Sequence, residues 1–486
     1  MSISTPARTL GIEFVCRELG NWRTSGRSGP AYRGLADALR MLIVDGRLPV
    51  GAQLPSERTL AEALRVSRTT VTSAYNQLRD DGYLHARRGA RSTIVLPSAP
   101  ADVPADAPAT INLAAAALPT TGAAAMQEAF AAATAQAAGH LQQSGHDLRG
   151  IAALRDAIAE RYCARGLPTD PEQIMVTSGA QHAIGLIMTT CLRPGDRVLV
   201  EQPTYHGALT AIAAADARAV PVPMTDTGWD VDGLHAAVRQ LAPSLAYLVP
   251  DNQNPTGFTM PAADRDRVTG IIAASRTRVI IDETMTDLWF EKPVPPPLAA
   301  FNRAALTAPA DLAITVGSMS KSFWAGLRVG WIRAQPSTLA AIRAVRPAVD
   351  LGSSVIDQLA AAWLLQRADD MLPARRDILR TRQALLIDLV RRELPDWLPL
   401  PGGGGMSLWV RLPAPVSTAL CAGASRLGVE LPPGPRFGVD GTLERFVRIP
   451  YTLPEEQLVE AVRLLGRAWR AVTGTAVTAG PSPVVV

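Results

Sequence analysis

The sequence predicts a small α+β module joined by a linker to a large α/β domain, which has a mostly parallel sheet and a small C-terminal α/β lobe. Three observations lead to this prediction. Residues 1–96 hold 14 arginines and only 8 acidic residues, whereas the rest of the chain is close to neutral. Residues 97–110 are rich in Pro, Ala and Asp and lack a hydrophobic period, as in an extended linker. Short apolar runs alternate with helical segments over residues 111–474, and residues 475–486 are expected to form a C-terminal tail.

The composition is that of a globular protein. Of the 486 residues, 47% are hydrophobic and 5% are aromatic, which is enough apolar surface for a sizeable core. No apolar run reaches the length of a membrane span, and the first residues lack the apolar core of a secretory signal, so we expect a cytoplasmic protein with no membrane partner. The four cysteines are isolated from one another, which predicts reduced thiols and neither a metal site nor a disulfide framework.

Helical periodicity predicts three helices in the N-terminal module. The first covers residues 32–45, where apolar positions recur three and four apart. The second covers residues 56–65 and the third residues 67–78, each behind a capping serine. Residues 83–95 alternate like a short hairpin with Gly89 at its tip. Three helices followed by a hairpin are typical of a winged helix-turn-helix, whose third helix enters the major groove of DNA.

The start of the third helix offers side chains that suit DNA. Ser67, Arg68, Thr69 and Thr70 supply three hydroxyls and one guanidinium that can make two hydrogen bonds to a base edge. Together with the basic charge of the module, these residues predict binding to double-stranded DNA. The alternative is a plain three-helix bundle with a solvated arginine face.

The stretch LPSERTLAEALRVSRTTVTSAYNQLRDDGYLHARRG, within residues 32–95, resembles the DNA-binding domain of GntR-family transcription regulators. The resemblance implies that a double-stranded DNA operator is a partner. Carried over position by position, it also implies the set of DNA-contacting residues: Arg58, Ser67, Arg68, Thr69, Thr70, Arg88 and Gly89.

Apolar runs in the large domain predict five strands of a buried sheet: Ile174–Thr177, Arg197–Val200, Leu245–Val249, Val279–Ile281 and Ala313–Val316. Several of these runs are followed by Ser, Asp or Asn. Because parallel strands present their carboxyl ends at one edge of the sheet, we expect these polar side chains to meet at a ligand site. Residues 406–412 and 445–452 predict two strands of the small lobe.

Lys321 is unusual because the chain has only two lysines among its 48 basic residues. The other, Lys292, lies in a proline-rich stretch and is expected to be a solvated surface residue. Arginine serves where a fixed cation is needed, whereas a desolvated lysine can lose its proton and attack a carbonyl. Ser318, Ser320 and Arg328 lie close to Lys321 in sequence and offer two hydroxyls and a guanidinium to a phosphate. The pattern suits a phosphorylated aldehyde held beside an amine.

Other residues extend this hypothesis. The free amides between a strand and the helix that follows it predict a second anion cradle, although such turns are more often simple caps: Ser178, Gly179, Ala180 and Gln181. Asp282 ends a buried strand next to Glu283, and a carboxylate there would keep a pyridine nitrogen protonated. Asn254 offers an amide to a ring oxygen, unless its NPTG motif is a plain turn. Tyr205 offers a ring for stacking, unless it only packs.

In this order, the motifs TSGAQ, DNQNPTG, IIDE, SMSKSFWAGLRVGW and RFVRIPY resemble fold-type-I pyridoxal-phosphate enzymes of the aspartate aminotransferase class, over about residues 111–470. The resemblance implies a pyridoxal 5'-phosphate cofactor bound to Lys321 as a Schiff base, with Asp282 on the pyridine nitrogen. It implies the remaining cofactor contacts as well: Asn254 to the phenolic oxygen, Tyr205 over the ring, and Ser178, Gly179, Ala180, Gln181, Ser318, Ser320 and Arg328 at the phosphate. Arg448 matches the arginine that binds a substrate carboxylate, and its alternative is a structural salt bridge.

A winged helix fused through a linker to this fold is the layout of MocR-type regulators, a subgroup of the GntR family. The resemblance implies a homodimeric, pyridoxal-phosphate-dependent transcription regulator that senses a small amino compound through aldimine formation. Two other interpretations stay open. One is an authentic aminotransferase with an autoregulatory DNA-binding domain, and the other is a regulator that senses the cofactor alone.

Two positions depart from the family pattern. Thr284 stands where the subgroup usually has a tyrosine that reaches the phenolic oxygen of the cofactor. Gly145 stands where the family usually has an aromatic residue that helps to form a phosphate site across the dimer. Each lost hydroxyl is expected to weaken cofactor retention by about 1 kcal/mol or more if nothing replaces it. These departures predict poor transamination more than they predict loss of binding.

Overall fold

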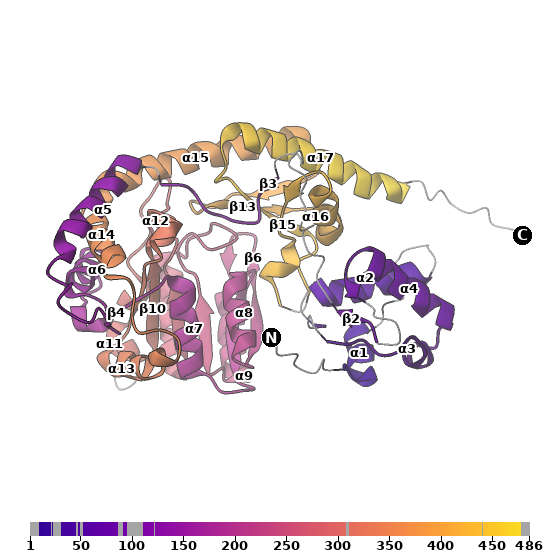
Figure 1. The fold of residues 1–486 in the computed structure, drawn as a ribbon, viewed down its shortest axis with the longest axis horizontal. Helices are drawn as coiled ribbons and strands as arrows, with labels where there is room; N and C mark the ends of the chain where they lie inside the picture. Colours follow the sequence, from indigo (N-terminus) through magenta and orange to yellow (C-terminus); the bar gives the residue numbers. More distant parts are fainter. Residues whose placement is uncertain are drawn as a thin grey trace, which may run out of the picture. The chain divides into compact units, whose positions relative to one another are not determined.

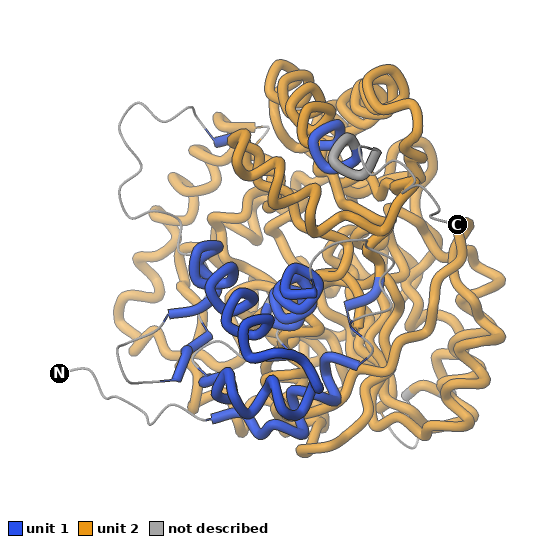
Figure 2. The backbone as a smooth tube through the Cα atoms, turned by 90° about the vertical axis from the view of Figure 1, so that its right-hand side faces the viewer, with its two compact units in different colours: residues 1–110, 440–442, 469–486 blue, residues 111–439, 443–468 orange. Residues whose placement is uncertain are grey.

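A computed structural model of the chain describes residues 9–20, 22, 31–44, 47–48, 52–85, 91–94, 110–120, 122–307, 311–439 and 441–477. The chain forms two compact units (Figure 2). Unit 1 comprises Met1–Thr110, Asp440–Thr442 and Trp469–Val486, and unit 2 comprises Ile111–Val439 and Leu443–Ala468. The predicted linker, residues 97–110, lies outside the described residues except for Thr110.

The N-terminal part of unit 1 is helical: α1 (Ile12–Leu19), α2 (Ala31–Val44), α3 (Glu57–Leu64) and α4 (Arg68–Asp80). The last three coincide with the predicted helices, whereas α1 was not predicted. The two expected serine caps are present, because the Ser56 hydroxyl accepts a hydrogen bond from the Thr59 amide and the Ser67 hydroxyl accepts one from the Thr70 amide, both at 3.1 Å.

A short antiparallel pair follows these helices. Strand β1 (Leu84–His85) pairs with β2 (Thr93–Ile94), which is the arrangement expected of the hairpin. The predicted tip of this hairpin, Gly89, lies outside the described residues. Apolar side chains from all four helices and both strands are buried together in one core, which makes unit 1 a winged helix-turn-helix.

Unit 2 contains an eight-stranded sheet with the spatial order β4-β11-β10-β9-β8-β5-β6-β7 (Figure 1). In chain order its strands are β4 (Ile174–Thr177), β5 (Arg197–Gln202), β6 (Arg218–Thr225), β7 (Gly228–Trp229), β8 (Leu245–Leu248), β9 (Arg278–Asp282), β10 (Ala313–Ser318) and β11 (Gly330–Arg333). Neighbours from β10 to β6 are parallel, whereas β11 is antiparallel to both of its neighbours. The prediction of a large, mostly parallel sheet is confirmed.

Helices cover both faces of this sheet. Successive side chains along a buried strand point to opposite sides, so both faces are apolar and both are packed against helices. Leu248 and Ile281 lie in one apolar cluster, whereas Ile280 lies in the other. The first cluster includes side chains of α6 (Ala152–Ala164), α9 (Val231–Leu241), α10 (Ala262–Ser275) and α14 (Val355–Leu365). The second includes side chains of α7 (Ala180–Cys191), α8 (His206–Ala214) and α13 (Pro336–Val345).

A smaller antiparallel sheet forms the C-terminal lobe, with β13 (Ser407–Arg411) between β12 (Leu398–Leu400) and β15 (Phe446–Pro450). Strand β3 (Ile111–Asn112) pairs in parallel with β14 (Val429–Glu430). The remaining helices are α5 (Ala123–Ala137), α11 (Arg303–Thr307), α12 (Met319–Ser322), α15 (Ala368–Glu393), α16 (Ser417–Ser425) and α17 (Glu455–Val477). Five 3-10 turns complete the described elements: η1 (Pro171–Gln173), η2 (Leu298–Ala300), η3 (Ala325–Leu327), η4 (Arg346–Ala348) and η5 (Gly434–Phe437).

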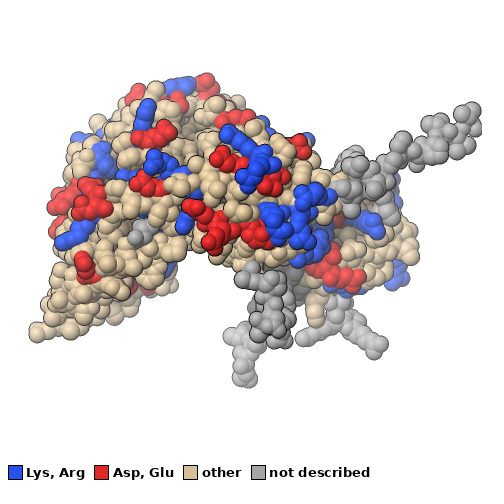
Figure 3. Space-filling model, turned by 90° about the horizontal axis from the view of Figure 1, so that it is seen from above, with Lys and Arg blue, Asp and Glu red and all other residues tan. Residues whose placement is uncertain are grey.

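Helix α17 continues to Val477, so the first residues of the expected tail, residues 475–486, are helical. Acidic and basic side chains are interspersed over the surface seen in Figure 3, as expected of a chain whose larger part is close to neutral. None of the helices in the described parts of the chain combines the length and the apolar character that a membrane crossing needs.

Candidate functional site

The parallel strands bring the predicted polar residues to one cavity of about 500 Å³ in unit 2. Asp282 ends β9, Ser318 ends β10, and Asn254 follows β8, so all three lie at the carboxyl edge of the sheet. Most of the predicted cofactor residues line this cavity: Ala180, Gln181, Tyr205, Asn254, Asp282, Ser318, Ser320, Lys321 and Arg328. The predicted carboxylate-binding residue, Arg448, lines it as well.

Lys321 lies in α12, a single turn that follows β10 directly. The Lys321 ammonium donates a hydrogen bond to the Ala116 carbonyl at 2.6 Å. Burial, together with the positive charges of Arg448 and Arg375, lowers the pKa of Lys321 to about 8. A substantial fraction of neutral amine at ordinary pH is what a nucleophilic lysine requires.

Asp282 and Glu283 end the same strand but have different surroundings. The Asp282 carboxylate faces the cavity, where it accepts hydrogen bonds from the Tyr247 hydroxyl at 2.5 Å and the Thr284 amide at 2.9 Å. The pKa of Asp282 is raised, because the effect of burial outweighs that of these two hydrogen bonds, which act in the opposite direction. Glu283 instead accepts a hydrogen bond from Arg165 at 3.1 Å. Asp282 is therefore the carboxylate available to a group in the cavity.

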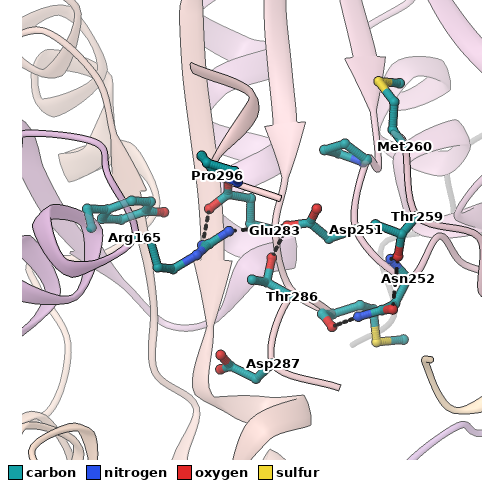
Figure 4. Close-up of polar contacts among 12 residues, drawn as sticks. Arg165, Asp251, Asn252, Thr259, Met260, Glu283, Thr286, Asp287 and Pro296 are labelled. Atoms are coloured by element: carbon teal, nitrogen blue, oxygen red, sulfur yellow. Dashed lines mark hydrogen bonds and ion pairs between the residues drawn. The ribbon is translucent and has the colours of Figure 1, made fainter. Parts of the chain in front are cut away.

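Arg165 links Glu283 to a second buried carboxylate (Figure 4). Asp251 forms an ion pair with Arg165 at 3.4 Å and accepts a hydrogen bond from Thr286 at 2.5 Å. Its other oxygen is paired with Arg265, which is fully buried. Arg165 and Arg265 therefore balance the charges of Asp251 and Glu283. Asp282 is outside this network.

Two of the residues predicted to form an anion cradle, Ser178 and Gly179, contact Arg328. The Arg328 guanidinium donates to the Ser178 carbonyl at 2.9 Å and lies across Gly179, whose φ is +105°. A Cβ at Gly179 would lie 3.0 Å from this guanidinium, so glycine leaves the room that the arginine occupies. Ser318 caps α12, because its hydroxyl accepts from the Ser320 amide at 3.1 Å. Ser178 and Gly179 hold Arg328 but do not line the cavity themselves.

Two buried polar atoms at the cavity lack a hydrogen-bond partner among the described residues, namely the side-chain oxygen of Asn254 and the Nε of Arg448. Arg448 is 3% exposed, and its Nη2 donates to the Ala114 carbonyl at 2.5 Å. It forms no ion pair with any residue that the structure describes, which disfavours the structural salt bridge. Burial lowers the pKa of Arg448 to about 10. Unpartnered polar atoms of this kind fit a ligand that carries oxygen and nitrogen.

The two departures from the family pattern have structural counterparts. Thr284 lines the cavity beside Asp282, so its shorter side chain leaves space where a tyrosine would extend. Gly145 adopts a φ of +75° in an exposed loop, a conformation that residues with a side chain rarely adopt. An aromatic residue at this position would therefore strain the backbone in its present conformation.

Several residues at the site were not predicted from the sequence. His206 lies between the rings of Tyr205 and Phe437, and burial together with Arg448 and Arg436 lowers its pKa to about 4, so it is neutral. Arg436 also lines the cavity. Tyr247 was missed as the partner of Asp282. The available signal was a polar ring in a strand whose other residues are aliphatic or small.

In unit 1, the start of α4 presents the predicted DNA-contacting face. Arg68 and Thr69 are exposed, and the Ser67 hydroxyl lies 3.0 Å from the hydroxyl of Thr69 and 2.8 Å from that of Thr70. Arg58, on α3, is exposed and lies 3.4 Å from Glu62. The predicted Arg88 and Gly89 lie outside the described residues.

Comparisons with known proteins agree with this division. Residues 108–465 match the family described as aminotransferase class I and II, and residues 31–94 match the bacterial regulatory proteins of the gntR family. The 2-aminoadipate transaminase of Thermus thermophilus is 31% identical to the chain over 327 residues, which cover 66% of this chain and 80% of the relative. An uncharacterized HTH-type transcriptional regulator of Escherichia coli, YdcR, is 28% identical and spans 90% of this chain and 98% of its own length.

Two further relatives complete the comparison. The probable rhizopine catabolism regulatory protein MocR of Rhizobium meliloti is 26% identical over 79% of this chain and 82% of its own length. The crystal structure of LysN, an alpha-aminoadipate aminotransferase of Thermus thermophilus complexed with N-(5'-phosphopyridoxyl)-L-leucine, superposes with a TM-score of 0.69 at 28% identity, and covers 75% of this chain and 93% of that one. The chain therefore belongs to the aminotransferase class I and II family and, through its GntR-type helix-turn-helix, to the MocR-type subgroup of GntR regulators.

Proposed function

We propose that this protein is a pyridoxal-phosphate-dependent transcription regulator that binds a DNA operator through unit 1 and a small amino compound through the cavity of unit 2. The observation that carries the proposal is a lysine of lowered pKa beside a buried carboxylate and an arginine cradle, in a chain that also has an exposed recognition helix. Relatives named as transcriptional regulators match the chain over most of its length, which supports a regulator over a free-standing enzyme.

The cavity residues fit pyridoxal phosphate. Lys321 would carry it covalently, Asp282 would hold its ring nitrogen protonated, and Arg328 would pair with its phosphate. The Asn254 amide and the Tyr205 ring would hold its phenolic oxygen and its face. When bound, the cofactor supplies an electrophilic carbon that an amine can attack. Arg448, with its unpartnered Nε, would then bind the carboxylate of that amine.

Regulation requires that the amino compound bind one arrangement of the protein better than another. We propose a homodimer, because paired recognition helices read two half-sites about one helical turn apart. The test starts by selecting an operator from a random DNA library with the full chain. Affinity is then measured for the protein alone, with pyridoxal phosphate, and with pyridoxal phosphate plus individual amino acids. A response to pyridoxal phosphate alone indicates a cofactor sensor, and no response to any of them rejects the proposal.

The capture of pyridoxal phosphate should depend on pH through Lys321. A lysine attacks as the neutral amine, which predominates above its pKa, so capture accelerates as pH rises. With a pKa of about 8, the rate should increase about tenfold from pH 7 to pH 9 and then level off. Stopped-flow absorbance measures the rate, and N-acetyl-lysine serves as a solvated control whose rate keeps rising to higher pH. If the pH midpoint of capture equalled that of this control, Lys321 would be solvated, which would contradict the burial seen in the structure.

Transamination should be slow because Thr284 lacks the phenolic hydroxyl that the subgroup's tyrosine places on the cofactor. Steady-state turnover is expected to stay below about 1 per second, the lower end of ordinary enzymatic rates. Thr284→Tyr should increase the release of keto acid from an amino acid in a single turnover, since the cavity has room beside Asp282. Rapid-quench analysis of keto acid measures this step, and Thr284→Val is the control for loss of the hydroxyl alone. Turnover at enzymatic rates by the unmodified protein would favour the authentic aminotransferase.

A further inference from the structure

A short extended segment of unit 2, Ala114–Pro119, here called the strap, runs between β3 and α5 (Figure 1). Its backbone carbonyls accept hydrogen bonds from three cations, two of which, Lys321 and Arg448, line the cavity. The Ala114 carbonyl accepts from Arg448 at 2.5 Å, and the Ala116 carbonyl accepts from Lys321 at 2.6 Å. In an extended chain, alternate residues face the same side, which explains the spacing of these two bonds.

The strap has few other means of attachment at the site. Residues 114–117 are four consecutive alanines, so their side chains offer no hydrogen bond. The amides of Ala114 and Ala115 both donate to the side-chain oxygen of Asn112, at 2.9 and 3.3 Å, which fixes the turn out of β3. Among the described residues, the hydrogen bonds that attach the strap at the cavity are therefore those that its backbone carbonyls accept.

Arg375, on α15, fastens the other end of the strap. Its side chain donates to the Pro119 carbonyl at 3.0 Å and to the Leu118 carbonyl at 3.3 Å. The same guanidinium donates to the Lys321 carbonyl at 2.7 Å. Arg375 is 1% exposed and has no carboxylate within ion-pair distance among the described residues. A buried guanidinium satisfied only by carbonyls is costly, and its position ties the strap to the turn that carries the lysine.

The strap engages two side chains that the proposed function assigns to ligands: the Lys321 ammonium, and Arg448 through its Nη2, which lies next to the unpartnered Nε. A carboxylate accepts from a guanidinium more strongly than a peptide carbonyl does, and a covalent bond at Nζ removes hydrogens that the Ala116 carbonyl now shares. We infer that the strap competes with ligands for Lys321 and Arg448, and that Arg375 is the positioning residue that holds it in place to do so. Capture of the cofactor by Lys321 frees the strap at Ala116, and a carboxylate that takes both Nε and Nη2 of Arg448 frees it at Ala114. The strap stays attached through Arg375.

This inference rests on the proposed function and adds a route for regulation. The strap follows β3, the first element of unit 2, which in turn follows the predicted linker, residues 97–110, in the sequence. Ligand binding therefore breaks hydrogen bonds in the segment that connects, along the sequence, to the DNA-binding unit. Coupling of this kind needs no contact between the ligand and the DNA-binding unit.

Hydrogen–deuterium exchange on the full-length protein tests the inference, with pyridoxal phosphate alone as the probe. Peptides that span residues 111–122 should exchange about tenfold faster when the cofactor is bound. The amides of Ala114 and Ala115, which donate to Asn112, open to solvent more readily once the Ala116 carbonyl has lost its bond to the Lys321 ammonium. In Arg375→Gln they should exchange fast before the cofactor is added and change little afterwards. Arg375→Lys, which keeps a donor and the charge, should restore part of the protection. The matched control is Arg382→Gln, since Arg382 lies on the same helix and donates to the Thr452 carbonyl at 2.9 Å without contacting the strap.

A second readout separates the role of Arg375 from general loosening of the fold. Arg375 lowers the pKa of Lys321, so Arg375→Gln should move the pH midpoint of cofactor capture upward, whereas Arg382→Gln should not. Peptides from β9 serve as the internal reference for folding. Binding of pyridoxal phosphate without any change in the strap, or equal behaviour of the two glutamine variants, overturns this inference alone. Failure of the protein to bind pyridoxal phosphate overturns the proposed function as well.

Discussion

Lys321→Ala should abolish covalent capture of pyridoxal phosphate, whereas Lys292→Ala should leave it intact. The chain has only these two lysines, and their surroundings are opposite. Lys292 is exposed, so its amine is solvated like that of a free lysine. Lys321 lies at the cavity with a pKa of about 8, and the carboxylate of Asp282 and the guanidinium of Arg448 line the same cavity. Removing this amine removes the only lysine placed to form the bond.

The measurement is borohydride reduction of the protein mixed with pyridoxal phosphate, followed by mass analysis of its peptides. The label should appear on the peptide that contains Lys321 and be absent from Lys321→Ala. Lys321→Arg is the matched variant, because it keeps a cation at the position but cannot supply a neutral amine. A label on Lys292, or retained label in Lys321→Ala, would contradict the assignment.

The sequence predicted the convergence of the site because parallel strands leave little freedom at their carboxyl ends. Once the runs that end near Asp282 and Ser318 are recognised as neighbouring parallel strands, their polar ends must share one edge. The structure adds the distinction between Asp282 and Glu283, which the sequence could not make. Adjacent residues at the end of a strand point to opposite sides, and only the packing of Arg165 shows which carboxylate is paired elsewhere.

Two strands of the large sheet that were not predicted, β6 and β11, have separate physical reasons. Strand β6 (Arg218–Thr225) contains Pro221 and Pro223, which lack an amide donor and rarely occur inside a sheet. It is also largely exposed or half-buried, so its hydrophobic pattern is weak. Strand β11 (Gly330–Arg333) runs antiparallel within a parallel sheet, and its first two residues belong to a motif that was interpreted for its chemistry.

The strap and its attachment to Arg375 could not be predicted from a sequence pattern. Backbone carbonyls carry no residue signature, and four alanines in a row predict only a lack of polar side chains. Arg375 is 256 residues from Pro119 along the chain, and one arginine in a helix with many arginines gives no sign of burial. Such contacts appear only when the fold places a helix across the site.

Arg68→Ala should remove specific operator binding while leaving cofactor capture unchanged. Arg68 is the first residue of α4, exposed beside the Ser67 cap, and it forms no ion pair with any residue that the structure describes. An arginine in this position of a recognition helix can make two hydrogen bonds to a guanine edge. The loss of such a contact costs about 1–3 kcal/mol, which corresponds to a drop of roughly 5- to 160-fold in affinity for the selected operator.

Mobility shifts at one fixed salt concentration should compare the selected operator with a scrambled DNA of equal length. Arg68→Ala should lower the ratio of the two affinities, because a base contact carries specificity, whereas loss of a phosphate contact would lower both affinities alike. Arg17→Ala is the matched control, since Arg17 lies on α1 with 71% of its side chain exposed and should leave the ratio unchanged. Equal losses on both DNAs would reassign Arg68 to the phosphate backbone. Unchanged affinity for both would remove the start of α4 from the DNA interface, and the proposed orientation of the helix-turn-helix on DNA with it.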